Sequence, residues 1–101
     1  MKAALKRKWV AALRSGKYAQ GRHYLRNSAG AYCCLGVLCK INTGRAPKKA
    51  AAVYYGASQG LITEIQEYRL ANLNDGHESS KRVLIPPKTF KQIAAYIERY
   101  V

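Results

Sequence analysis

Three cysteines and two histidines are the residues best suited to metal binding or nucleophilic chemistry: Cys33, Cys34, Cys39, His23 and His77. Thiolates are common zinc ligands, but structural zinc sites pair cysteines that are separated by roughly two to four residues. Here Cys33 and Cys34 are adjacent, so a third thiol and distant histidines would have to complete the site. The spacing favours buried structural cysteines, and we expect neither a metal nor another cofactor.

Catalytic groups are equally hard to assemble. A reactive Cys33 would need a helix start and a nearby base, for which His23 across a hairpin is the one candidate. The flanking residues match no nucleophile signature. Glu64 and Glu67 are best explained by the helix dipole, and the segment 15–17 lacks the rest of a phosphate-binding loop. We therefore expect a protein that is not an enzyme.

Positive charge is the strongest compositional signal. The chain has 18 lysines and arginines against five acidic residues, a net charge of +13, and its first acidic residue is Glu64. Such a one-sided distribution predicts a surface that attracts polyanions such as nucleic acid, acidic protein patches, nucleotides or anionic lipid. The alternative is that the charge serves solubility alone.

Specific side chains can be assigned to this surface. The cations that we expect to bind a polyanion are Lys6, Arg7, Lys8, Arg14, Lys17, Arg22, Arg26, Lys48 and Lys49. Aromatic rings between such cations are typical of single-strand binding, and the candidates for stacking on bases are Tyr18, Tyr24, Tyr54 and Tyr55. The alternative for these tyrosines is a place in the core.

The core should form around residues 31–39, nine consecutive residues with no charge and no strongly polar group. The stretch is far shorter than the roughly 20 residues of a membrane span. Helical spacing favours a buried helix over residues 33–41 that ends at 43–44, although a strand is the alternative. Gly36 would let another backbone approach closely, for example the N-terminal helix.

Other elements should pack around this core. Apolar spacing predicts an amphipathic helix over residues 2–14 with Trp9 as its anchor, although such a helix can also lie on a membrane or in a major groove. Turn residues predict a hairpin between 22–26 and 31–32, then a basic loop over 45–52. A third strand is expected at 53–55.

Two capping boxes predict the remaining helices. Thr63 and Gln66 begin a helix that ends at 74–76 and should turn Ile65, Tyr68 and Leu73 toward the core. Thr89 and Gln92 begin a helix with an apolar stripe of Phe90, Ile93, Ala94 and Ile97. Residues 83–85 pair as an edge strand or pack as a tether. We expect one α+β domain over residues 1–101, with about three antiparallel strands and about four helices.

Several segments resemble a widespread group of small phage and prophage proteins whose function is mostly uncharacterised. The resemblance covers Trp9 to Gln20, Leu25 and Arg26, the block Tyr-Cys-Cys-Leu-Gly-Val-Leu-Cys at 32–39, the sequence Leu-Asn-Asp-Gly at 73–76, and 90–97. Two departures stand out: Ile62 replaces an expected proline, and residues 77–87 look like an insertion.

The resemblance implies an accessory role in host takeover or counter-defence, for example an anti-CRISPR-like inhibitor of a host protein or ribonucleoprotein complex. A DNA- or RNA-binding protein is the alternative, and a binder of anionic signalling nucleotides is a further one. The odd number of cysteines, two of them adjacent, and the basic N-terminus, which leaves no secretory signal, indicate a cytoplasmic protein without membrane association. The resemblance to phage proteins implies that this cytoplasm is that of a bacterial host cell.

Overall fold

Four helices and two small antiparallel sheets make up the described part of the chain, which is residues 1–54 and 56–101 of a computed structural model. The elements in order are α1 (Ala3–Arg14), β1 (Tyr24–Arg26), α2 (Cys34–Thr43), β2 (Ala51–Ala52), α3 (Glu64–Asp75), β3 (His77–Glu78), β4 (Leu84–Ile85) and α4 (Phe90–Tyr100). The α+β class is confirmed. In place of one three-stranded sheet, β1 pairs with β2 and β3 pairs with β4.

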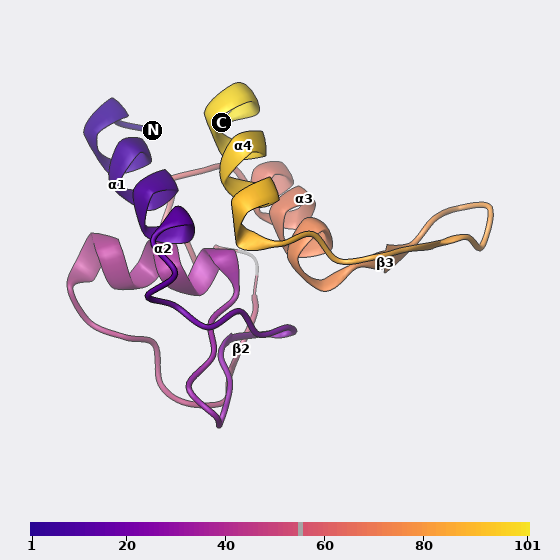
Figure 1. Cartoon of the computed structure of the whole chain (residues 1–101), viewed down its shortest axis with the longest axis horizontal. Coiled ribbons are helices and arrows are strands. Elements are labelled where there is room, and N and C mark those ends of the chain that lie inside the picture. Colours follow the sequence, from indigo (N-terminus) through magenta and orange to yellow (C-terminus); the bar gives the residue numbers. More distant parts are fainter. Residues whose placement is uncertain (55) are drawn as a thin grey trace.

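Helix α2 occupies the centre of the fold. It contacts α1, α3 and β1, while α1 lies beside α4 so that the two chain ends are at the same end of the molecule (Figure 1). Trp9 and Cys34 are fully buried, and the Trp9 indole Nε1 donates a hydrogen bond of 2.9 Å to the Cys34 carbonyl. The prediction of a buried helix at the uncharged stretch is thus confirmed.

Gly36 does permit a close backbone approach, but its partner is β1 and not the N-terminal helix. A Cβ atom at this position would lie 1.8 Å from the Leu25 carbonyl oxygen. The Cys33 amide donates to that same oxygen at 3.3 Å, which fixes strand and helix against each other. Any side chain at Gly36 would therefore force β1 away from α2.

Helix α3 turns inward a face that differs in part from the one predicted, since Leu73 packs against the core as expected but Ile65 and Tyr68 do not. Both capping boxes are present, at Thr63 and at the start of α4, and the apolar stripe of α4 is buried as expected. However, Ile65 is 65% exposed and Tyr68 is 54% exposed. At about 100° per residue, Glu67, Leu70 and Asn74 share the face that is buried instead. That face was hidden from sequence analysis because two of its residues are polar.

The strands also differ in position from those predicted. The expected hairpin is limited to one bridge, between Arg26 and Tyr32, and the regular partner of β1 is β2. Strand β2 precedes the expected third strand at 53–55, of which Tyr55 lies outside the described residues. Residues 45–52 therefore form more than a loop, since their last two residues build the β1–β2 ribbon.

Residues 77–87, here called the arm, form the second sheet. His77 faces Ile85 and Glu78 faces Leu84 across an antiparallel pair, so the strand alternative for residues 83–85 is correct for Leu84 and Ile85. The arm projects away from the helices (Figure 1). None of the described helices is long and apolar enough to span a bilayer.

Candidate functional site

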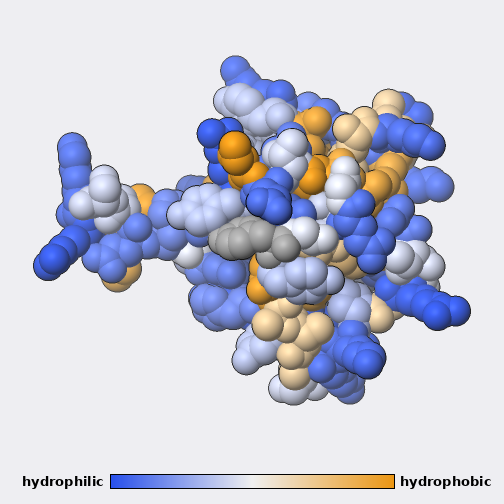
Figure 2. Space-filling model, turned by 180° about the vertical axis from the view of Figure 1, so that it is seen from behind, coloured by the Kyte–Doolittle hydropathy of each residue, from blue (hydrophilic) through white to orange (hydrophobic). Residues whose placement is uncertain are grey.

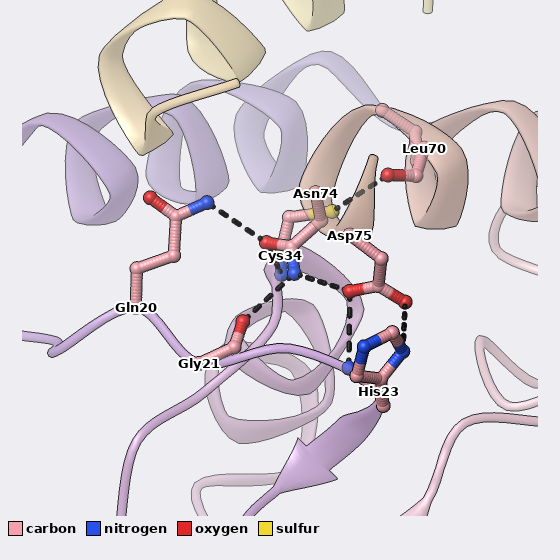
Figure 3. Close-up of polar contacts among 7 residues, drawn as sticks. All are labelled: Gln20, Gly21, His23, Cys34, Leu70, Asn74 and Asp75. Carbon is pink, nitrogen blue, oxygen red and sulfur yellow. Dashed lines mark hydrogen bonds and ion pairs between the residues drawn. The ribbon is translucent and has the colours of Figure 1, made fainter. Parts of the chain in front are cut away.

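A network of polar contacts joins segments that are distant in sequence. We call it the polar hub, and it consists of Gln20, Gly21, His23, Cys34, Asn74 and Asp75 (Figure 3). Its members come from the segment between α1 and β1, from the first turn of α2 and from the last turn of α3. The hub includes the asparagine and aspartate of the Leu-Asn-Asp-Gly sequence.

Asn74 is the centre of the polar hub and is fully buried. Its Oδ1 accepts from the Cys34 amide at 3.2 Å and from the Gln20 side chain at 3.1 Å. Its Nδ2 donates to the Gly21 carbonyl and to Asp75 Oδ1, both at 2.8 Å. A primary amide has two donors and two acceptor positions, so Asn74 has no capacity left for a ligand. Its role is structural.

Gln20 and Asp75 extend the hub. The Gln20 Nε2 also donates to the Lys88 carbonyl at 2.8 Å, and its Oε1 accepts from the Phe90 amide at 3.0 Å, which ties the start of α4 to the hub. Asp75 Oδ1 accepts from the His23 amide at 3.0 Å, and its Oδ2 lies 3.6 Å from His23 Nδ1. His23 is therefore held by Asp75.

The cysteines are poorly placed for chemistry. Cys33 begins α2, as expected for a reactive cysteine, but it is buried and its Sγ accepts from the Gly36 amide at 3.4 Å. Burial raises the pKa of Cys33 to about 12, and it raises the pKa values of Cys34 and Cys39 as well. All three thiols are protonated at neutral pH. Within the described chain, no group of three or more metal-binding side chains comes together.

Glu67 has a role that the sequence did not reveal. Its carboxylate is 1% exposed and accepts from the Gly56 amide at 2.6 Å, from the Ser58 amide at 3.4 Å and from the Ser58 hydroxyl. Glu67 therefore holds the loop before α3 against the helix. Its spacing of three and seven residues from Leu70 and Asn74 is the signal that could have identified it.

Most of the predicted cations fall into two regions. The first, here called the helix groove, is a hollow of about 460 Å³ lined by Ala3, Lys6, Arg7, Val10, Ala11, Arg14 and Glu98. Arg14 forms an ion pair with Glu98, and the Lys6 Nζ donates to the Glu98 carbonyl at 3.2 Å. The hydrogen bond from Arg14 lowers the pKa of Glu98. Lys8 lies outside the groove lining, although it is also exposed.

The second region, here called the ribbon region, surrounds the β1–β2 ribbon and contains Arg22, Tyr24, Arg26, Lys48, Lys49 and Tyr54. Arg26 is partly used by the fold, since its Nη1 donates to the Pro47 carbonyl at 3.3 Å and its guanidinium lies 5.9 Å from the Tyr32 ring centre. Tyr24 and Tyr54 are 40% and 56% exposed. Both rings are therefore accessible to solvent.

A hollow of about 580 Å³ adjoins the ribbon region, and its lining comprises Leu25, Cys39, Thr43, Arg45, Ala46, Pro47, Tyr54, Ala57 and Gln59. Arg45 was absent from the predicted set, because nothing in its local sequence distinguishes it from other loop cations. Tyr18 is half-buried and packs edge-on against Tyr32 at 5.1 Å, so it belongs to the fold. The predicted stacking residue Tyr55 lies outside the described residues.

The two basic regions lie on different sides of α2. Figure 1 shows the start of α1 at the end of the molecule where both termini lie, and the β1–β2 ribbon at the opposite end. Lys17 and Arg22 are exposed in the segment that connects α1 with β1. Apart from Lys8 and Lys17, the predicted cations therefore lie in two regions and not in one continuous site.

Comparison with known proteins identifies a family for the N-terminal half of the chain. The family model described as Domain of unknown function (DUF8296) matches residues 1–52, which is just over half of the chain. The matched segment runs from α1 to β2 and contains every cation of the predicted set. Neither the search of curated proteins nor the search of solved structures gives a match.

Proposed function

The chain belongs to the family described as Domain of unknown function (DUF8296), so we propose its function from its own charge and geometry: it holds a polyanionic partner through its two basic regions, without catalysis. The observation that carries this proposal is the lack of internal compensation for a net charge of +13. Among the described residues, Arg14 is the only lysine or arginine in an ion pair with a carboxylate.

The acidic residues are mostly committed elsewhere. Glu67 is buried against backbone amides, Asp75 belongs to the polar hub, and Glu98 pairs with Arg14. Uncompensated charge of one sign destabilises a compact state by self-repulsion. A partner with the opposite charge removes that repulsion, so the charge distribution supports the binding of a polyanion.

The partner that we propose is a host protein or ribonucleoprotein complex with an acidic or nucleic-acid surface, in the cytoplasm of a bacterial cell. The resemblance to small phage proteins supports this partner, because counter-defence and host takeover are roles of such proteins. The protein would then act as an inhibitor, in the manner of an anti-CRISPR protein.

A pull-down from a bacterial lysate, with and without nuclease, tests this proposal. The bait is the tagged full chain, and the variant carries Arg7→Glu, Lys48→Glu and Lys49→Glu. The control carries Arg69→Glu and Lys91→Glu on α3 and α4, outside both basic regions. We expect one host complex to survive nuclease and to be lost only with the first variant. Equal retention by both variants contradicts the proposal.

Direct binding of nucleic acid is the second candidate, and the exposed rings of Tyr24 and Tyr54 favour it. Each stacked base contributes about 1–3 kcal/mol, so Tyr54→Ala should weaken single-strand binding by roughly 5- to 150-fold. The matched control is Tyr100→Ala, since Tyr100 is 62% exposed on α4. Fluorescence anisotropy with a labelled oligonucleotide measures both. Equal affinities for the two variants would exclude stacking by Tyr54.

A further inference from the structure

The arm is the feature that the two basic regions leave unexplained. We propose that it enters the major groove of double-stranded DNA, where Lys81 and Arg82 contact phosphates and Leu84 contacts base edges. This inference rests on the second candidate function and specifies the form of nucleic acid. The arm lies outside the matched residues 1–52, so it is a feature of this chain beyond the family segment.

The tip of the arm has a defined backbone. The Ser79 amide donates to the Val83 carbonyl and the Arg82 amide donates to the Ser79 carbonyl, both at 2.9 Å. The Ser79 hydroxyl accepts from the Val83 amide at 3.2 Å. Arg82 adopts the left-handed conformation with φ of 57°. These bonds close a tight turn that presents Lys81 and Arg82 together at the end of the arm.

The base of the arm is also defined. Gly76 has φ of 75°, and a Cβ atom there would lie 2.8 Å from the Ile85 carbonyl oxygen. The Lys88 amide donates to the Leu73 carbonyl at 2.7 Å, which returns the chain to α3. The arm is thus anchored at its start and at its end, so its direction is set by the fold.

The surface of the arm combines charge with exposed apolar groups. Val83 is 55% exposed and Leu84 is 79% exposed, so neither apolar side chain is buried in the core. Figure 2 shows the arm standing out from the body, covered mostly by hydrophilic residues with a few hydrophobic ones. Cations next to apolar side chains on one projection suit a ligand with phosphates outside and bases inside.

The widths of the grooves favour B-form DNA over an RNA duplex as the ligand of the arm. The major groove of B-form DNA, about 12 Å wide, admits a two-stranded β-ribbon without distortion, whereas the minor groove of about 6 Å would have to widen. The major groove of an RNA duplex is too deep and narrow for side chains to read. Glu78 and Leu84 face each other across the strands and share one face of the arm. A carboxylate can accept from the cytosine amino group, and an apolar side chain can contact the thymine methyl group.

Binding of a labelled 20-base-pair duplex and of one of its single strands tests the inference. The arm variant carries Lys81→Ala and Arg82→Asn, because asparagine tolerates the left-handed conformation at position 82. A second variant, Leu84→Ser, leaves the charge unchanged. The comparison variant, Lys48→Ala with Lys49→Ala, removes the same charge from the ribbon region. Circular dichroism confirms that each variant is folded.

We expect the arm variant to lose at least about tenfold more affinity for the duplex than for the single strand, and to lower the salt slope of duplex binding by about 1 to 2. The comparison variant should show no such preference. Leu84→Ser should weaken duplex binding without changing the salt slope. An excess of a minor-groove ligand should leave duplex binding intact.

Three results overturn the inference alone. In the first, the arm variant and the comparison variant lose duplex affinity and single-strand affinity equally. In the second, the wild-type chain binds a single strand or a host complex but no duplex. In the third, the arm variant loses binding to a host protein and not to DNA. The last result marks the arm as a protein-docking element. A wild-type chain that retains no polyanion of any kind overturns the proposed function as well.

Discussion

Asn74 uses one buried amide to hold the first turn of α2, the segment before β1 and the last turn of α3. Two of these contacts satisfy backbone groups, the buried Cys34 amide and the half-buried Gly21 carbonyl. Leaving such a group unsatisfied costs about 1–3 kcal/mol, more than the bond itself contributes in net terms. The residue therefore matters more for the fold than its size suggests.

Asn74→Ala should lower the free energy of unfolding by about 2–4 kcal/mol, because the Cys34 amide and the Gly21 carbonyl lose their partner. Urea denaturation followed by circular dichroism measures this loss. Asn72→Ala is the matched control, since Asn72 is half-buried in the same helix. Similar stability of the two variants would show that the hub is dispensable.

The raised pKa of Cys33 gives the stability of the fold a pH dependence. Its folded pKa is about 12 against an ordinary value of 9.0, so the unfolded chain releases the thiol proton first. The stability that the protonated thiol contributes to the folded state is complete below pH 9 and is lost as the pH rises toward 12. Between pH 8 and pH 10.5, the free energy of unfolding of Cys33→Ser should fall by about 2 kcal/mol less than that of the wild type, as measured by urea unfolding. If the stabilities of the two proteins changed with pH in the same way, burial would not be holding the Cys33 thiol protonated.

At the scale of elements, the contact between β1 and α2 depends on the missing side chain of Gly36. Gly36→Ala should cost about 3 kcal/mol of stability, because its Cβ would overlap the Leu25 carbonyl oxygen. Gly44→Ala separates this effect from backbone strain, since Gly44 has φ of 75° and open space around its Cβ position. It should cost only about 1–2 kcal/mol in the same thermal or urea measurement. Equal costs would mean that β1 moves without penalty.

The helices could be predicted from the sequence because their signals are local. Capping residues and a three- and four-residue apolar spacing lie within one element, as at Thr89 and Gln92. The strands could not be placed in this way, since the partner of β1 lies 25 residues further along the chain, at Ala51–Ala52. A pairing of two residues at such a distance leaves no periodic pattern in the sequence.

The candidate site, too, could be predicted from the sequence only in part. The sequence identifies the cations and exposed tyrosines by type, but their separation into a helix groove and a ribbon region follows from where α2 lies. Glu67 and Asn74 were missed because polar residues on a buried face look like surface residues. What distinguishes them is the set of backbone groups that they satisfy, and those groups come from other segments.

At the scale of the whole molecule, self-repulsion among like charges should make the free protein less stable at low ionic strength. The Debye length shrinks from about 30 Å at 0.01 M salt to about 10 Å at 0.1 M, which is within the dimensions of this chain. We expect the thermal midpoint to rise between 10 mM and 200 mM sodium chloride. Affinity for a polyanion should fall over the same range. A midpoint that is insensitive to salt would mean that the charges do not interact.

The arm has one more consequence, which concerns association between copies of the chain. A two-stranded ribbon exposes backbone amides and carbonyls along both outer edges, and such edges are sites of aggregation. Here each strand has only two residues, Lys81 lies at the turn, and Pro86 and Pro87 follow β4 without amide donors. Short strands, charge and proline all oppose edge-to-edge pairing. These features allow the arm to extend into solvent without favouring edge-to-edge pairing with another copy.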